Sequence, residues 1–280
     1  MKASRLCLLI VSIPLLQGVL SAQEPVRHDS AVTPAPIVMR RDLATLGAGA
    51  GLALLAQRVD LRVRNELRSS AWQENDALNA LESVGDAWGG AAAVGAGLML
   101  WGGGRYAGNA TAAASGFRAI EAITVSGLVT GLIKSSVGRA RPRVDSTNAW
   151  NVEFGRGFRS SSGDYQSMPS GHSTAAFAFA AAVTSEVVRR APARARLVGV
   201  TTYGLAVITA WSRLHSNAHW LSDVTMGSSI GMASGWAVTR WHATRPNNRV
   251  DHLFLGPTIS PLVTQLPHGS TLLGASIAWR

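Results

Sequence analysis

The feature that most constrains this chain is the abrupt change from a polar loop to an apolar segment at Ser170. Residues 155–166 are rich in Gly, Ser and Arg, whereas residues 174–188 are mainly Ala, Phe and Val. A serine at such a junction is a typical helix N-cap, and the turn that follows combines unpaired N–H groups with the positive end of the helix dipole. Gly171 lets a ligand approach the backbone, and His172 can carry a proton near neutral pH. The junction therefore suits an anion such as phosphate, although a capped helix with an incidental histidine is the alternative.

A second stretch, residues 134–142, reads Lys-Ser-Ser-Val-Gly-Arg-Ala-Arg-Pro and follows an apolar helical run. Lys134 and Arg141 are seven positions apart, which is about two helical turns, so we expect both cations on one helix face. Pro142 is expected to end the helix at Arg141. A basic helix C-terminus that complements the dipole is the alternative. Against it, Lys134 is the only lysine after Lys2 in a chain that otherwise uses arginine.

A third stretch, residues 212–223, reads Ser-Arg-Leu-His-Ser-Asn-Ala-His-Trp-Leu-Ser-Asp. His219 and Asp223 are four residues apart, so we expect them to be stacked on one helical face. A carboxylate there accepts a hydrogen bond from one imidazole nitrogen and leaves the other nitrogen available as a nucleophile. The alternative is a surface His–Asp pair that stabilises a helix by roughly a few tenths of a kcal/mol.

In order and spacing, the three stretches resemble the signature of the type 2 phosphatidic acid phosphatase and vanadium haloperoxidase superfamily. That signature is Lys, six residues, Arg-Pro; then Pro-Ser-Gly-His; then Ser-Arg, five residues, His, three residues, Asp. The resemblance covers roughly residues 119–241. It implies an all-α fold, a six-helix bundle, and a phosphatase that hydrolyses phosphomonoesters or pyrophosphates without a metal or other cofactor.

The resemblance also implies a role for each matching residue. His219 would attack phosphorus and form a phosphohistidine, Asp223 would orient His219, and His172 would protonate the leaving oxygen and then activate water. The phosphoryl oxygens would be held by Lys134, Arg141, Ser170, Gly171 and Arg213. Three cations and a helix N-terminus supply the charge stabilisation that phosphoryl transfer needs. Use of the same fold with vanadate as a haloperoxidase, and a non-catalytic envelope scaffold, are the alternatives.

The N-terminus is typical of an export signal, which we expect over residues 1–22. Lys2 and Arg5 precede a short apolar core, and small residues at 21–22 suit cleavage. An uncleaved anchor is the alternative. Cys7 is the only cysteine and lies in this segment, so the mature chain would have neither disulfides nor cysteine-based sites.

We divide the remaining chain into a polar linker, a helical phosphatase domain and a tail, at residues 23–41, 42–245 and 246–280. Helices of the domain are expected near residues 43–57, 87–104, 121–134, 170–191, 197–211 and 219–241. The charged segment 58–75 is expected to be a solvated or interfacial helix. The tail has short alternating apolar stretches around Pro-His-Gly-Ser and predicts a β-hairpin.

The net charge is +10, but the arginines are scattered and no nucleic-acid-binding motif is present. The charge therefore favours phosphorylated or anionic-lipid partners and argues against nucleic acid. The apolar runs are about 15–18 residues long, at or below the length that crosses a bilayer. A mean hydropathy of +0.15 is low for a protein with many membrane spans.

Membrane topology adds a constraint on the predicted helices. If the signal is cleaved, the mature N-terminus is outside, and six spanning helices would leave the motifs in the cytoplasm. Either the run 43–57 does not span, or the bundle lies outside the bilayer. We therefore expect an exported, periplasm-facing, membrane-associated enzyme of the cell envelope that acts on a lipid phosphate. A soluble exported non-specific acid phosphatase is the alternative, and the oligomeric state stays open.

Overall fold

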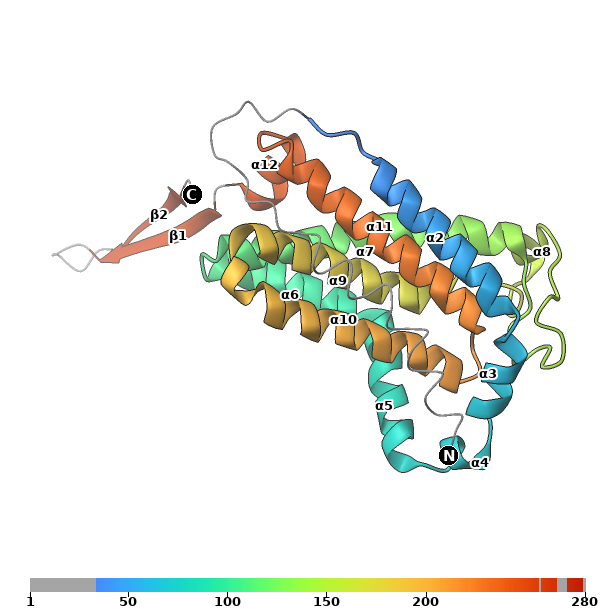
Figure 1. Cartoon of the computed structure of the whole chain (residues 1–280). Coiled ribbons are helices and arrows are strands. Elements are labelled where there is room, and N and C mark those ends of the chain that lie inside the picture. The colour runs from blue at the N-terminus through green and yellow to red at the C-terminus, as the bar shows by residue number, and fades with distance from the viewer. Residues whose placement is uncertain (1–33, 257, 266–270, 279–280) are drawn as a thin grey trace.

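Figure 1 shows the computed structural model of the chain, which describes residues 34–256, 258–265 and 271–278. The expected signal segment, with Cys7, and most of the expected linker lie outside these residues. The fold is mainly α-helical, as predicted. The helices are α2 (Arg40–Gln57), α3 (Asp60–Leu67), α4 (Ser70–Gln73), α5 (Asp76–Ala87), the π-helical turn η1 (Trp88–Ala92), α6 (Ala93–Tyr106), α7 (Ala110–Val137), α8 (Arg156–Arg159), α9 (Gly171–Arg190), α10 (Pro192–His215), α11 (Leu221–Ala243) and α12 (Arg249–Leu255). In the tail, strand β1 (Thr258–Gln265) pairs antiparallel with β2 (Thr271–Ala278).

Helix α9 is the central helix of the domain and packs against α7, α10 and α11 (Figure 1). Residues 176–183 of α9 are all buried, with exposed fractions between 0 and 5%. A helix that is apolar on all sides needs partners on all sides, which explains why this run lies in the middle of the bundle. Phe179, for example, packs edge to face against Trp88 with ring centroids 5.1 Å apart. The N-terminus of α9, where Ser170 is found, is thereby held in a fixed position.

Glycines on one face of α11 let this helix approach α9 closely. Gly227, Gly231 and Gly235 are four residues apart and lie on the face that meets α9. A Cβ on Gly227 would lie 2.4 Å from the carbonyl oxygen of Ser170, and one on Gly231 would lie 2.3 Å from that of Thr174. Small residues at this spacing allow two helix backbones to pack together. They bring the first turns of α9 and α11 side by side.

The predicted end of α7 is wrong, and the difference changes the position of the predicted site residue Arg141. The helix ends at Val137 because Gly138 adopts a left-handed conformation with φ of 63°. A left-handed glycine is a common helix end, and Gly138 precedes Pro142 in the chain, so the helix ends before it reaches the proline. Arg141 therefore lies beyond the helix and does not share a helix face with Lys134.

The predicted start of α11 is also wrong. The helix begins at Leu221, so His219 lies in the turn before it and not on a helical face with Asp223. Asn217 in this turn has a positive φ of 59°, and the N–H of His219 donates to the carbonyl oxygen of Arg213 over 3.1 Å. The turn therefore folds His219 back against the end of α10.

Two predicted helices are broken up, so the description as six helices is incomplete. The run expected as a helix over residues 87–104 is interrupted at η1, where Gly90 leaves helical geometry (φ −99°, ψ −125°). Single π-helical turns of this kind are frequent at functional sites. The charged segment 58–75 forms α3 and α4, and Asp60 at the start of α3 is buried, not solvated.

Among the residues that the structure describes, α7 and α10 are long and apolar enough to cross a membrane. Core helices of soluble proteins can satisfy the same criterion. Part of α7 nevertheless presents large apolar side chains to its surroundings, with Leu128 68% exposed and Leu132 65% exposed. These leucines lie one turn apart on a single stripe.

Candidate active site

The C-terminus of α7, the N-terminus of α9 and the turn between α10 and α11 meet at one end of the bundle. The N–H of Ser170 donates to the carbonyl oxygen of Asp223 over 2.9 Å, which joins α9 to α11. A Cβ on Gly171 would lie 3.6 Å from Cε of Lys134, which places the end of α7 beside the same turn. Residues from all three predicted motifs are thus brought together.

His219 is buried, and its two ring nitrogens face different surroundings. Nε2 lies 3.3 Å from Nη1 of Arg141. Nδ1 lies 3.5 Å from Oδ2 of Asp223, longer than a normal hydrogen bond, and has no other partner among the described residues. Burial, followed by the charges of Lys134 and Arg141, lowers the pKa of His219 well below 6.5, against the opposite effect of Asp223. The imidazole is therefore neutral near pH 7, and a proton on Nδ1 leaves the lone pair on Nε2.

The carboxylate of Asp223 is completely buried, and both of its oxygens accept hydrogen bonds. Oδ1 accepts from Nη1 of Arg139 over 2.6 Å, and Oδ2 accepts from the hydroxyl of Ser167 over 2.5 Å and the N–H of Trp220 over 2.8 Å. Burial alone would raise the pKa of Asp223, but Arg139, His219 and Ser167 lower it to about 2. Asp223 is consequently an anion whose position is fixed from several sides.

Arg139 and Asp60 complete this arrangement, and the sequence analysis identified neither. Nη2 of Arg139 donates to Oδ2 of Asp60 over 2.8 Å, and both side chains have no exposed surface. Asp60 also accepts from the N–H of Ser222 over 3.0 Å and from its hydroxyl over 2.6 Å. Arg139 is inside the basic stretch between Lys134 and Arg141, but nothing in that pattern separates a buried arginine from a ligand-binding one.

His172 lies in the first turn of α9 and is more open than His219. Its side chain is 36% exposed, and Nε2 is 3.5 Å from Oδ1 of Asp86 at the end of α5. The same carboxylate forms an ion pair with Arg213. The backbone of η1 passes close by, since a Cβ on Gly89 would lie 2.7 Å from Cβ of His172. Asp86 and Gly89 therefore shape the site from a segment in which the sequence analysis identified no site residue.

Lys134 and Arg141 are anchored to the loop that precedes α9. Nζ of Lys134 donates to the carbonyl oxygen of Gln166 over 2.6 Å, and Nε of Arg141 donates to that of Gly163 over 2.9 Å. Burial, and then the charges of these two cations, lower the pKa of His172 below 6.5. The same two side chains act on His219, and burial lowers the pKa of Lys134 itself to about 7, so Lys134 is only partly charged near neutral pH.

The predicted N-cap at Ser170 is confirmed. Its hydroxyl oxygen accepts from the N–H of Ser173 over 3.5 Å and from the hydroxyl of Ser173 over 3.1 Å. Its own N–H is used in the bond to Asp223. An anion at this helix N-terminus would therefore meet the Ser170 hydroxyl and the backbone that follows it, at Gly171.

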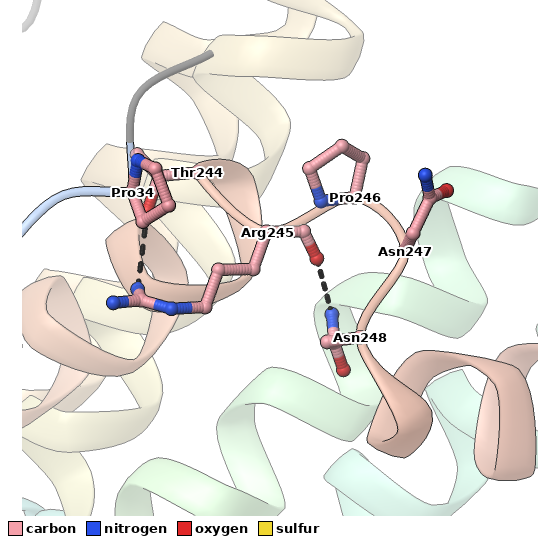
Figure 2. A pocket seen from close by; sticks show the side chains of 6 residues that line it. All are labelled: Pro34, Thr244, Arg245, Pro246, Asn247 and Asn248. Atoms are coloured by element: carbon pink, nitrogen blue, oxygen red, sulfur yellow. Dashed lines mark hydrogen bonds between the residues drawn. The ribbon is translucent and has the colours of Figure 1, made fainter.

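An open groove of about 580 Å³ lies at the other end of α11 and is distinct from the site (Figure 2). Its lining residues are Pro34, Thr244, Arg245, Pro246, Asn247 and Asn248. None of them belongs to the three motifs. Among the described residues, no group of three or more His, Cys, Asp or Glu side chains is arranged to hold a metal ion.

Residues 115–247 match the family model described as PAP2 superfamily. A stretch of 88 residues is 38% identical to a lipid A 1-phosphatase of Porphyromonas gingivalis and covers 31% of this chain but 19% of that protein. The chain thus spans about a fifth of this curated relative. A crystal structure of a transmembrane PAP2-type phosphatidylglycerolphosphate phosphatase from Bacillus subtilis aligns with 85% of this chain and 97% of its own length. The sequence identity is 17% and the TM-score is 0.37.

Proposed function

We propose that this protein is a metal-independent phosphatase that removes phosphate from phosphomonoesters or pyrophosphates of lipids through a phosphohistidine intermediate. The observation that carries the proposal is the state of His219. This buried, neutral imidazole has Nδ1 toward Asp223 and Nε2 toward Arg141, and the charge of Lys134 also acts on it. A phosphoryl group attracted by those cations would lie against the nucleophilic nitrogen.

In the first step, Nε2 of His219 forms a bond to phosphorus while the bond from phosphorus to the leaving oxygen breaks. His172 donates its proton to that oxygen. In the second step, water attacks phosphorus, His172 takes a proton from the water, and the bond to Nε2 breaks. Lys134, Arg141, Arg213, the Ser170 hydroxyl and the Gly171 backbone hold the phosphoryl oxygens throughout. The catalytic unit is the bundle of the six longer helices, and the two-stranded tail is an appendage.

Exposed apolar side chains near the site support a lipid substrate. The stripe on α7 that contains Leu128 and Leu132 leads to the loop before α9. In this loop Trp150, Phe154 and Phe158 are 60%, 83% and 66% exposed. Tryptophan favours the interface between water and lipid, and the two exposed phenylalanines add apolar surface beside it. The lipid A 1-phosphatase relative fits a lipid phosphate substrate, and the predicted export signal fits an enzyme on the outer side of a membrane.

The decisive test is phosphate release in the presence of EDTA by the wild type and by His219→Ala. We expect release by the wild type to survive EDTA and release by His219→Ala to be lost. Acid-quenched enzyme should carry a phosphohistidine in the wild type alone. Full activity of His219→Ala, or loss of wild-type activity in EDTA, would overturn the proposal.

The substrate class is tested by comparing a lipid phosphate in mixed micelles with a soluble aryl phosphate. The wild type and the double variant Phe154→Ser/Phe158→Ser are compared on both. We expect the double variant to lose activity on the lipid and to keep it on the aryl phosphate. Equal turnover of both substrates by both proteins would instead indicate a soluble-substrate acid phosphatase.

A further inference from the structure

Beneath the site, a buried network of charges links Asp223 to a segment outside the matched superfamily region. The side chains of Asp60, Arg139 and Asp223 have no exposed surface, and Ser222 is also buried. Nη2 of the Arg139 guanidinium donates to Asp60 over 2.8 Å, and Nη1 donates to Asp223 over 2.6 Å. Asp60 is on α3, before the matched residues 115–247.

Ser222 closes the network into a ring. Its hydroxyl accepts from Nη1 of Arg139 over 2.7 Å and donates to Oδ2 of Asp60 over 2.6 Å. Its backbone N–H, in the first turn of α11, donates to Oδ1 of Asp60 over 3.0 Å. Asp60 thus accepts an N–H that has no partner within α11 and also complements the helix dipole.

We infer that Asp60 and Arg139 are positioning residues that hold Asp223 in the orientation which sets the tautomer of His219. The inference rests on the proposed phosphatase function and extends it to two residues that touch no substrate. Asp223 approaches Nδ1 of His219 at 3.5 Å, so a small rotation of the carboxylate would break this contact. Arg139 prevents that rotation, and Asp60 prevents Arg139 from moving.

The charges of the network support the same inference. Asp60 and Asp223 carry two negative charges against the one positive charge of Arg139. The remaining negative charge stabilises the positive charge that develops on His219 when Nε2 bonds to phosphorus. Without Asp60, the whole charge of Arg139 would act on Asp223, and Asp223 would stabilise His219 less.

The rest of the chain offers a matched control. Asp42 and Arg240 form another buried ion pair, with exposed fractions of 2% and 8%, between α2 and the far end of α11. Asp42→Asn removes the charge of a buried, arginine-paired carboxylate without touching the site. Its effect separates general loss of stability from loss of positioning.

The experiment compares the wild type, Asp60→Asn, Ser222→Ala and Asp42→Asn in two measurements. The first is kcat and KM for phosphate release. The second is ¹⁵N NMR of the imidazole nitrogens, in which His219 is assigned among the 7 histidines by its loss in His219→Ala. We expect Asp60→Asn to lower kcat on the order of 10-fold, less than the ~10⁴-fold that loss of a directly orienting carboxylate can cause. KM should change less than about twofold, because this interaction acts mainly in the transition state.

In the NMR measurement, His219 of the wild type should be the single tautomer protonated on Nδ1, and Asp60→Asn should give a mixture. Ser222→Ala should shift both measurements in the same direction by a smaller amount, and Asp42→Asn should shift neither. Wild-type kcat and tautomer in both Asp60→Asn and Ser222→Ala would overturn the inference, as would equal effects of Asp42→Asn.

The same experiment remains informative if Asp60→Asn does not fold or if the wild type is inactive. If Asp60→Asn does not fold, Ser222→Ala decides the inference with the same two measurements. If the wild type releases no phosphate, the proposed function fails. The tautomer of His219 in the variants still supports or overturns the positioning role.

Discussion

His219 lies just before the first turn of α11 and His242 in its last turn, and each histidine is next to carboxylates. Nε2 of His242 is 2.9 Å from Oε2 of Glu121, and Nδ1 is 2.9 Å from Oδ1 of Asp251. Burial alone would lower the pKa of His242, but these two carboxylates raise it. The pKa of His219 is lowered in spite of Asp223.

Burial disfavours the charged imidazole at both histidines, and the difference is whether the surrounding charges overcome it. At the site, Arg139 forms an ion pair with Asp223 and offsets part of its negative charge, and Lys134 and Arg141 add positive charge. At the far end, Arg118 is near Asp251 and Glu121 but leaves a net negative charge for the imidazole. A neighbouring carboxylate therefore does not decide whether a buried histidine is a nucleophile or a structural cation. Burial and the sum of the surrounding charges decide it together.

The largest expected effect separates these two roles directly. His219→Gln keeps a hydrogen-bonding side chain but lacks the nucleophile, and we expect phosphate release to fall at least about 10³-fold. The matched variant His242→Gln should keep kcat within about twofold, because His242 contacts Glu121 and Asp251 at the other end of α11. Steady-state phosphate release measures both. Comparable losses in the two variants would mean that His242 acts in the reaction, and the comparison would fail.

The next effect compares the two buried arginines. Arg139→Met leaves the carboxylates of Asp60 and Asp223 buried without a cation, and loss of one partner of a buried pair costs about 3–5 kcal/mol. Arg118→Met should cost less, about 1–3 kcal/mol. Its partners Glu121 and Asp251 are 25% and 19% exposed, and His242, whose pKa is raised, remains beside them. The free energy of unfolding in urea gives both values, and an equal loss would show that burial of the partners has no influence.

This contrast also explains what the sequence could reveal. The eight predicted site residues belong to short motifs in which residue type and spacing indicate the chemistry. Asp60 and Asp86 are single acids in charged or mixed segments, and their partners Arg139 and Arg213 are far away in the chain. The order of helices followed from apolar runs, but the turns did not. Gly138 ends α7 in a left-handed conformation, which is a local signal that the sequence analysis did not use. Asn217 has a positive φ in the turn before α11. As a result, Arg141 and His219 lie outside the helices predicted for them.

A smaller effect should appear in the pH dependence of activity. Burial and the cations Lys134 and Arg141 lower the pKa of His172 below 6.5, and His172 must be protonated to act as the acid. We expect kcat/KM to fall as pH rises through that lowered pKa. A bound phosphate neutralises the two cations, so the corresponding fall in kcat should occur at higher pH. His242→Gln should leave both profiles unchanged. Coincident profiles for kcat and kcat/KM would contradict this account of the charges.

The smallest expected effect is the pH dependence of stability, where the two histidines should act in opposite directions. The pKa of His242 is raised above its unfolded value of 6.5, so its stabilising effect is complete below that pH and is lost as pH rises through the folded-state pKa. The pKa of His219 is lowered, so its contribution is present above 6.5 and is lost as pH falls below that value. The free energy of unfolding, measured in urea across this range, should decline on both sides. His242→Gln should flatten the alkaline decline alone, and His219→Gln the acidic decline alone, because each variant removes one titrating group. If His242→Gln changed the acidic side instead, the assignment of His242 as a structural cation would be wrong.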